Sequence, residues 1–192
     1  MITIAWDVDD VLNDLTSVWL QKHWRPAHPA CRTAYRDLRA NPPHALIGAG
    51  LDEYLESLDE FRRNRYLSDL QPLPEALAFF ERNGDRYRHI ALTAVPLRYA
   101  PVSAGWVLRY FGRWIRSFNF VPSRRPDESL PEYDASKQEF LSWWGKASVL
   151  VDDHAGNVES ARKAGVQAVL MPRPWNGGPD ALEETFRKLE SL

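Results

Sequence analysis

Three short, mainly apolar segments recur along the chain, and each is followed at once by a polar side chain. Runs of four or five such residues are typical of buried strands. In chain order, residues 2–6 precede Asp7, residues 89–92 precede Thr93 and residues 148–151 precede Asp152. Residues 118–121 and 167–171 are predicted as a fourth and a fifth strand.

Helical patterns lie between these strands, and the residues beside them are typical of helix ends. Strands that alternate with helices build a parallel sheet covered on both faces, and such sheets bind ligands at the carboxyl ends of their strands. We therefore predict an α/β fold with a doubly wound, Rossmann-type parallel sheet. The predicted helices are residues 74–83 before Gly84, residues 136–144 between the caps Ser136 and Gly145, and residues 157–164 before Gly165.

The stretch between residues 15 and 73 interrupts this alternation. It is helical in tendency, contains several prolines and carries aromatic side chains too often for a disordered linker. We predict a core domain of residues 1–14 and 74–192, with a small helical cap of residues 15–73 inserted after the first strand. Residues 122–134, which are charged and rich in proline, are predicted to form a surface loop.

Overall charge and cysteine usage exclude several classes of partner. The formal net charge is -2, so charge alone recruits neither a nucleic acid nor an acidic membrane surface. No apolar run reaches the roughly 18 residues that a membrane-spanning helix needs, and the N-terminus lacks a signal-peptide pattern. The single cysteine, Cys31, fits a reducing compartment. We expect a cytoplasmic protein that binds neither nucleic acid polymers nor membranes.

The sequence WDVDDVLND, residues 6–14, places four aspartates directly after the first predicted strand. Aspartate is common in turns and at helix N-termini, so this cluster alone is weak evidence for a site. In a parallel sheet, however, Asp7 and Asp9 would meet the pair Asp152–Asp153 at one edge. Carboxylates so close together stay ionised only around a cation, and Mg²⁺ prefers such oxygen ligands. We therefore predict a magnesium site at this edge.

These residues resemble, in order and spacing, the four motifs of the haloacid dehalogenase-like (HAD) hydrolases. The resemblance spans residues 7–176, and a cap between the first and second motifs resembles the C1 type. The last part, residues 151–176, is similar to the 5′(3′)-deoxyribonucleotidase branch. The motif positions are the segment Asp7–Leu12, Thr93 after a strand, Lys137 at a helix start and the pair Asp152–Asp153.

The resemblance implies a role for each motif residue. Asp7 is the expected nucleophile, which forms an aspartyl-phosphate, and Asp9 is the expected general acid and base. Thr93 and Lys137 are expected to hold the phosphoryl oxygens, by a hydrogen bond and by an ammonium charge.

The resemblance also implies where Mg²⁺ binds. The ion is expected between the Asp7 carboxylate, the Asp9 backbone carbonyl and the acidic pair, where it neutralises charge that would repel a phosphate. Within the pair, Asp152 is favoured as the metal ligand. Asp153 is expected beside it or in its place.

The acid expected at Asp9 favours one reaction class. Dehalogenases of this superfamily lack an acid there, so the resemblance implies a phosphatase that acts on a small phosphorylated metabolite. A nucleoside monophosphate, and hence a 5′-nucleotidase activity, is the suggested example. Two alternatives stay open: a phosphotransferase or phosphomutase, and a HAD-like domain retained as a binding module without catalysis.

Residues close to the motifs have a structural interpretation beside a functional one. Asp10 and Asp14 are expected to be charges at a helix N-terminus. Asn13 and His154 either touch the substrate or serve as capping and surface residues.

Further candidates lie in the cap and in two loops. Trp175 and Asn176 could border the pocket, whereas Arg124 and Arg125 are expected to be a solvated loop pair. Tryptophans in the cap are expected mostly to pack in its interior. The cap side chains that would suit stacking on a base or pairing with an anion are Trp19, His23, Trp24, Arg62, Arg63 and Arg65.

Overall fold

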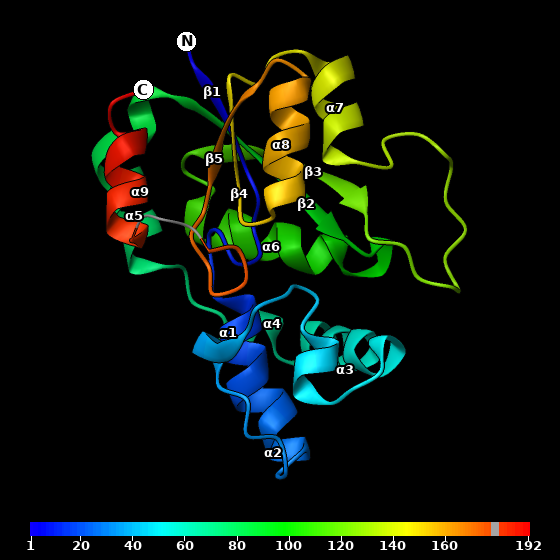
Figure 1. Cartoon of the computed structure of the whole chain (residues 1–192). Coiled ribbons are helices and arrows are strands. Elements are labelled where there is room, and N and C mark those ends of the chain that lie inside the picture. Colours follow the sequence, from blue (N-terminus) through cyan, green and yellow to red (C-terminus); the bar gives the residue numbers. More distant parts are fainter. Residues whose placement is uncertain (178–180) are drawn as a thin grey trace.

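A parallel sheet of five strands forms the core of the chain (Figure 1). The computed structural model describes residues 1–177 and 181–192. The strands are β1 Thr3–Trp6, β2 Arg88–Val95, β3 Ile115–Pro122, β4 Val149–Asp152 and β5 Gln167–Leu170. Their order is β3-β2-β1-β4-β5, and every neighbouring pair is parallel. The chain therefore builds outward from β1 in both directions, which confirms the predicted doubly wound sheet.

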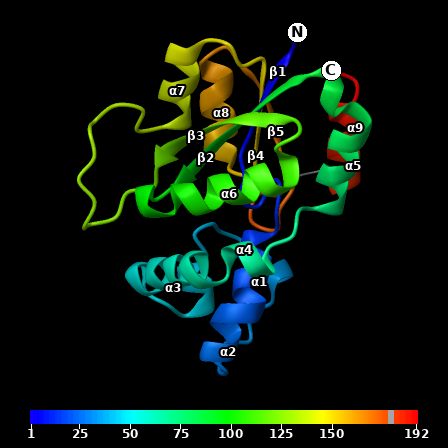
Figure 2. The same ribbon diagram turned by 180° about the vertical axis from the view of Figure 1, so that it is seen from behind.

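Helices cover both faces of this sheet. They are α5 Pro74–Asn83, α6 Ala100–Phe111, α7 Lys137–Trp144, α8 Ala155–Lys163 and α9 Leu182–Leu189. Helices α7 and α8 lie on one face and α5, α6 and α9 on the other, as the two opposite views show (Figures 1 and 2). The sheet is thus buried on both sides, which is why its central strands are almost wholly apolar.

Side chains of β1 alternate between the two apolar clusters that result. Ile4 and Trp6 belong to the larger cluster, which includes side chains of α5, α6 and α9, and Ala5 belongs to the cluster under α7 and α8. The Trp6 ring lies 5.1 Å from the Phe80 ring, and its indole nitrogen donates to His89 Nδ1 at 3.0 Å. β1 is therefore held on both faces at the centre of the fold.

The residues predicted to mark the ends of α7 and α8 do so in the structure. Ser136 caps α7, because its hydroxyl accepts a hydrogen bond from the backbone nitrogen of Glu139 at 3.2 Å. Gly145 ends α7 in the left-handed conformation with φ of 64°. Gly165, with φ of 80°, follows α8, which begins at Ala155, two residues before the predicted start.

Gly84 follows the end of α5, as predicted, but not in the left-handed conformation that is common for a glycine there. Its φ is -59°, and the chain continues into the 3-10 turn η4 Gly84–Arg86. A β-carbon at this position would lie 2.5 Å from Cδ1 of Trp114. Glycine is needed here because the Trp114 ring lies against the backbone.

Two helices and the full length of two strands were not predicted. Helix α6 carries Pro101 and Gly105, which resemble breakers, although proline suits the first turn of a helix. Helix α9 repeats its apolar side chains at Leu182, Phe186 and Leu189, a helical spacing that was a usable signal. β2 continues to Val95 and β3 starts at Ile115, so both strands are longer than their apolar cores.

The insertion after β1 is helical, as predicted, and lies beyond the carboxyl end of the sheet (Figure 1). We call residues 15–73 the cap. Its interior is aromatic: the Trp19 ring meets the Tyr54 ring edge-on at 5.2 Å, and the Trp24 ring stacks on His28 at 3.6 Å. Its elements are α1 Leu15–Trp19, η1 Leu20–Trp24, α2 Arg25–Ala27, η2 Tyr35–Asp37, η3 His44–Ile47, α3 Leu51–Asn64 and α4 Tyr66–Asp69.

The two connections between core and cap run side by side. The backbone nitrogen of Leu73 donates to the carbonyl of Leu12 at 2.9 Å, and Asn13 forms an antiparallel bridge with Pro72. The chain therefore enters and leaves the cap at one place on the core.

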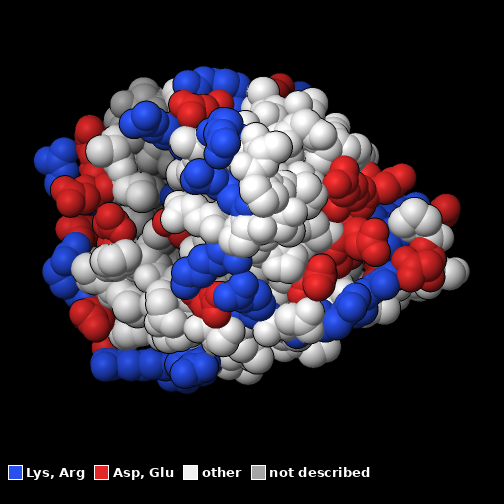
Figure 3. Space-filling view, turned by 90° about the horizontal axis from the view of Figure 1, so that it is seen from below, with Lys and Arg blue, Asp and Glu red and all other residues white. Residues whose placement is uncertain are grey.

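Charged side chains of both signs are interspersed on the face seen from the cap side (Figure 3). The described residues on that face form no continuous basic surface. Among residues 1–177 and 181–192, no helix has the length and apolar character required to cross a membrane.

Candidate active site

The register of the sheet brings the motif residues to one edge. Trp6, the last residue of β1, pairs with Ala91 of β2 and Val151 of β4. Asp7 therefore follows β1 at the level where β4 ends, and its backbone nitrogen donates to the carbonyl of Val151 at 2.9 Å. This edge, next to the point where the strand order reverses, is where doubly wound sheets bind ligands.

Three carboxylates meet at this edge. One oxygen each from Asp7, Asp152 and Asp153 lies within 4.8 Å of the others, and all three residues are buried. The structure thus brings together residues from the first and last predicted motifs. We call these three side chains the acidic cluster.

Lys137 is the cation that faces the acidic cluster. It is the first residue of α7, and its Nζ lies 2.8 Å from Oδ2 of Asp7 and 2.6 Å from Oδ2 of Asp152. Burial acts to lower the pKa of Lys137, but the charges of Asp152 and Asp7 outweigh it and raise that pKa. Lys137 therefore remains an ammonium ion, and it bridges β1 and β4.

One ammonium group does not balance three carboxylates. Burial, together with the charge of Asp152, raises the pKa of Asp7 to about 7 despite the contact with Lys137. Burial and the charge of Asp7 likewise raise the pKa of Asp153 well above its usual range. The surplus negative charge and the exclusively carboxylate donors fit a hard divalent cation such as Mg²⁺.

The two members of the acidic pair have different surroundings. Asp152 accepts hydrogen bonds from Lys137, from the backbone nitrogen of His154 at 2.8 Å and from Asn157 Nδ2 at 3.1 Å. Oδ2 of Asp153 accepts from the indole nitrogen of Trp175 at 3.0 Å, and Asp153 also lines the cavity described below. Each oxygen of Asp152 thus already accepts from protein donors, whereas Asp153 lies in the wall of the cavity.

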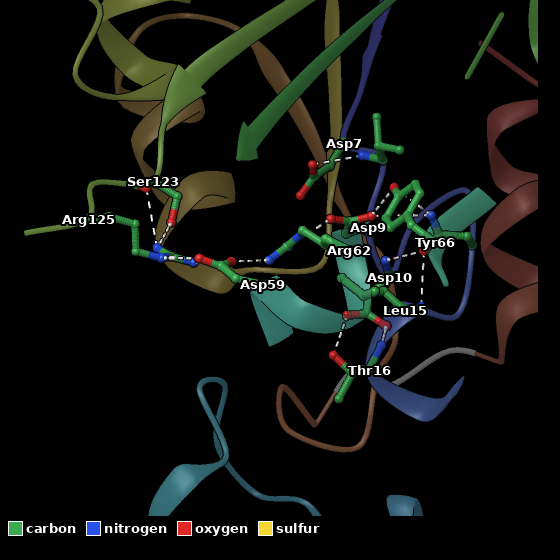
Figure 4. A network of polar contacts seen from close by, with 12 residues as sticks. Asp7, Asp9, Asp10, Leu15, Thr16, Asp59, Arg62, Tyr66, Ser123 and Arg125 are labelled. Atoms are coloured by element: carbon green, nitrogen blue, oxygen red, sulfur yellow. Dashed lines mark hydrogen bonds and ion pairs between the residues drawn. The ribbon is translucent and has the colours of Figure 1, made fainter. Parts of the chain in front are cut away.

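Asp9 is held by the cap rather than by the acidic cluster (Figure 4). Its Oδ2 accepts from Arg62 Nη2 at 3.0 Å. Its Oδ1 accepts from the hydroxyl of Tyr66 at 2.5 Å and from Asn13 Nδ2 at 3.2 Å. Burial and the charge of Asp9 raise the pKa of Tyr66, so its hydroxyl stays a neutral donor. Three donors therefore converge on Asp9.

Thr93 is buried at the same edge with a free hydroxyl. It lies within β2, is 1% exposed, and its Oγ1 has no hydrogen-bond partner among the described residues. A buried hydroxyl without a partner is costly unless a ligand satisfies it. Its position suits a group that enters the cavity.

A cavity of about 220 Å³ lies between the core and the cap. Pockets for drug-sized ligands measure about 300–1,000 Å³, so this one fits a smaller molecule. Its wall includes Asp7, Asp9, Thr93 and Asp153 from the core and Tyr54 and Arg62 from the cap.

The cap residues proposed for base stacking lie elsewhere. Trp19 and Trp24 are 0% and 2% exposed and belong to the apolar cluster, so the expectation that they could stack on a base is wrong. Arg62 lines the cavity, but its guanidinium is paired with Asp9 and lies 3.6 Å from Asp59.

Asp10 supports the start of the cap, as predicted for a helix N-terminal charge. It has a φ of 58°, and its carboxylate accepts hydrogen bonds from the backbone nitrogen and the hydroxyl of Thr16 in α1. Burial raises the pKa of Asp10 to about 6 although Arg173 and Thr16 oppose the change. Arg173 Nε donates to the Asp10 carbonyl at 2.6 Å, and its Nη1 pairs with Asp14 at 3.1 Å.

The remaining candidates act as supports, and several supports were missed. Asn13 contacts Asp9 and Tyr66, whereas His154 occupies the N-cap position of α8 without a side-chain capping bond and lines the cavity. Trp175 and Asn176 both contact Asp153, through its carboxylate and its carbonyl. The residues that sequence reasoning did not find are Tyr66, Asn157 and Arg173.

No protein-family model matches the chain, and no curated protein matches it by sequence. Solved structures match it in fold. A protein from Thermotoga maritima assigned as a β-phosphoglucomutase has a TM-score of 0.59 and 17% identity over 100% of both chains. A haloacid dehalogenase-like family hydrolase from Streptococcus pneumoniae has a TM-score of 0.62 and 12% identity over 97% of this chain and 91% of its own.

A third solved structure, a protein from Lactobacillus delbrueckii assigned as a phosphoglycolate phosphatase, has a TM-score of 0.60. It is 13% identical and covers 98% of this chain and 96% of its own. At such low identity these likenesses concern the fold. The chain has the haloacid dehalogenase-like α/β fold.

Proposed function

We propose that this protein is a Mg²⁺-dependent phosphomonoester hydrolase that works through an aspartyl-phosphate. The observation that carries the proposal is the buried acidic cluster with Lys137, which opens through Asp7 and Asp153 onto a small cavity. The HAD-like fold supports it. Residues of the first, second and last resembling motifs line this cavity, and Lys137 of the third contacts Asp7 behind its wall.

Asp7 is the nucleophile in this proposal. Its Oδ1 accepts from the backbone nitrogen of Val8 at 2.7 Å and its Oδ2 from Lys137, so the carboxylate is fixed in orientation. In the first step a carboxylate oxygen of Asp7 bonds to phosphorus as the ester P–O bond breaks. In the second step water attacks phosphorus, and the Asp7 carboxylate and inorganic phosphate are released.

Asp9 is the proposed proton carrier. It gives a proton to the leaving alcohol oxygen in the first step and takes one from the attacking water in the second. Arg62, Tyr66 and Asn13 all donate to it and occupy three of the roughly four lone-pair sites of a carboxylate, which leaves about one site for the transferred proton. Arg62 and Tyr66 therefore influence when Asp9 can act.

Mg²⁺ would be held by the carboxylates of Asp7 and Asp153, with the Asp9 carbonyl as a further oxygen donor. When bound, the ion would neutralise the acidic cluster and polarise the phosphoryl group. We favour Asp153 over Asp152 as the ligand, because Asp152 is already saturated by Lys137, Asn157 and His154. Asp152 then serves to hold Lys137.

The phosphoryl oxygens are proposed to contact Thr93 and Lys137. The Thr93 hydroxyl has no partner among the described residues, so it is available as a donor to an incoming anion. Lys137 keeps its charge in this buried place and attracts the phosphate electrostatically.

A small phosphate ester is the proposed substrate. The cavity of about 220 Å³ and the absence of Trp19 and Trp24 from its wall favour a compact leaving group. One similar structure is assigned as a phosphoglycolate phosphatase, which acts on such a compound. A nucleoside monophosphate remains a candidate only if the cap opens further.

Phosphoryl transfer to an alcohol or a sugar is the second candidate. The similarity to a protein assigned as a β-phosphoglucomutase favours it, because an aspartyl-phosphate can be attacked by a hydroxyl other than water.

A panel of phosphorylated metabolites tests these proposals. The protein is incubated with each compound in Mg²⁺ and in EDTA, and released phosphate is measured. Repeating the active reactions with added alcohols and sugars separates hydrolysis from transfer. Inactivity across the panel with Mg²⁺ would reject a phosphatase and favour a binding module.

A further inference from the structure

We propose that Arg125 is a positioning residue that acts through Asp59 on Arg62 and so fixes the guanidinium at Asp9. The inference rests on the proposed function, in which Asp9 carries the proton. It assigns a role to a core residue that lies outside the four motifs and the cavity wall.

Arg125 is buried, which overturns the expectation of a solvated pair. It is 8% exposed, whereas its neighbour Arg124 is exposed. Its Nε and Nη2 donate to Oδ2 and Oδ1 of Asp59, both at 2.8 Å, in a two-pronged ion pair (Figure 4). Its Nη1 donates to the hydroxyl and the carbonyl of Ser123 at 3.1 and 3.3 Å. Arg125 is thus held at the end of β3 and binds the cap through Asp59.

Asp59 of helix α3 contacts both Arg125 and Arg62. It is 7% exposed and lies one turn before Arg62, so both side chains face the core. Oδ1 of Asp59, which accepts from Arg125, also lies 3.6 Å from Arg62 Nη1. Asp59 therefore sits between two guanidinium groups.

Arg62 completes the series at Asp9. It is 7% exposed, and its Nη2 donates to Oδ2 of Asp9 at 3.0 Å. The four charges alternate in sign from the buried Arg125 through the buried Asp59 and Arg62 to the partly buried Asp9, and they cross from core to cap and back (Figure 4). Each charge is stabilised mainly by its neighbours in the series.

Loss of Arg125 would redistribute these contacts. Asp59 would keep Arg62 as its guanidinium partner and would draw it from 3.6 Å into direct contact. Arg62 would then move away from Asp9. Turnover falls because Asp9 loses its fixed orientation, although Arg125 touches neither the substrate nor Asp9.

The test compares Arg125→Gln with the matched control Arg124→Gln, which changes the neighbouring but exposed arginine. We expect Arg125→Gln to lower kcat by about tenfold to a hundredfold with a smaller change in KM, and Arg124→Gln to leave both unchanged. Arg125→Lys keeps the positive charge but cannot form the two parallel hydrogen bonds to Asp59. It should therefore retain part of the kcat that Arg125→Gln loses.

A double mutant separates positioning from general stability. In an Arg62→Gln background, Arg125→Gln should cause little further loss of kcat, because its effect passes through Arg62. An equal loss in both backgrounds would overturn the proposal. If Arg125→Gln fails to fold, Asp59→Asn is used in the same cycle, since it keeps the side-chain shape.

A structural readout keeps this test independent of the proposed function. A crystal structure of Arg125→Gln, or of Arg125→Lys if needed, should show the contact between Arg62 and Asp9 lost. Retention of that contact near 3.0 Å would overturn the positioning role even if the enzyme were highly active. Conversely, an inactive wild-type protein would reject the phosphatase proposal but would leave this measurement valid.

Discussion

The ammonium of Lys137 lies 2.8 Å from the carboxylate of Asp7, which joins the start of helix α7 to the end of the central strand β1. The pair is buried, so its geometry depends on the packing of the whole core. Lys137 also holds Asp152 at 2.6 Å, and this leaves Asp153 free to face the cavity.

Replacement of Asp7 by asparagine is expected to abolish turnover. Asparagine cannot form the acyl phosphate, so kcat should fall by about 10³-fold or more. Release of phosphate from a chromogenic ester measures the loss. The exposed Asp52 provides a control, and Asp52→Asn should keep full activity. Unaltered turnover of Asp7→Asn would reject Asp7 as the nucleophile.

The two members of the acidic pair should respond differently to substitution. Asp153→Asn should weaken Mg²⁺ binding by about tenfold or more, because it removes a ligand. Asp152→Asn should have a smaller effect on Mg²⁺ affinity and a larger one on phosphate affinity, because it loosens Lys137. Titration calorimetry with Mg²⁺ alone and with inorganic phosphate measures both. The opposite pattern would make Asp152 the ligand.

Thr93→Val should reduce activity without harming the fold. The hydroxyl has no partner among the described residues, so its removal costs no internal hydrogen bond. Loss of one hydrogen bond to a charged phosphate should lower kcat/KM by about 10- to 100-fold. Thr93→Ser, which keeps the hydroxyl, is the control. A large fall in the melting temperature of Thr93→Val would contradict this account.

In the absence of metal, stability should fall as pH rises from about 4 to about 7. Burial raises the pKa of Asp7 from 3.8 to about 7, so in this window the folded state binds a proton that the unfolded state has lost. The contribution is fully present below the unfolded value and is lost as pH approaches the folded value. Thermal unfolding in EDTA at several pH values measures it. Asp7→Asn cannot titrate and should show a weaker dependence; an identical slope would refute the assignment.

Gly84→Ala should destabilise the core by about 1–3 kcal/mol. The new β-carbon would lie 2.5 Å from the Trp114 ring, so the ring or the backbone must move. Gly105 in helix α6 is the matched control, because a β-carbon there meets nothing within 4 Å. Gly105→Ala should stabilise by about 0.5–1 kcal/mol through helix propensity. Denaturant unfolding of both variants checks the difference, and equal effects would contradict it.

The sheet and the motif edge were predictable because their signals are local. A short apolar run that ends at Asp7 or Asp152 predicts both a buried strand and the place where it stops. Ser136 and Gly145 likewise mark the ends of α7 through their own hydrogen bond and backbone conformation. These features need no knowledge of the rest of the chain.

The partners of Asp9 and Asp59 could not be predicted in this way. Arg62 and Tyr66 meet Asp9 because the cap packs against the core, and nothing in their neighbouring residues shows that contact. Arg125 stands in a charged segment rich in proline, so its composition predicted solvent exposure. It is buried because it pairs with Asp59, which is distant in the sequence and belongs to helix α3 of the cap.

The two connections at Leu12 and Leu73 lie side by side, so the chain leaves the core and returns to it at nearly the same point. Its two ends are joined by one backbone hydrogen bond, so a longer, shorter or different insert would leave the distance between β1 and α5 unchanged. In the proposed phosphatase, exchange of the insertion would change the cap side of the cavity, where Tyr54 and Arg62 lie, while the register of β1 with β2 and β4 stays the same. Related chains would then differ most in size and composition between these two leucine positions.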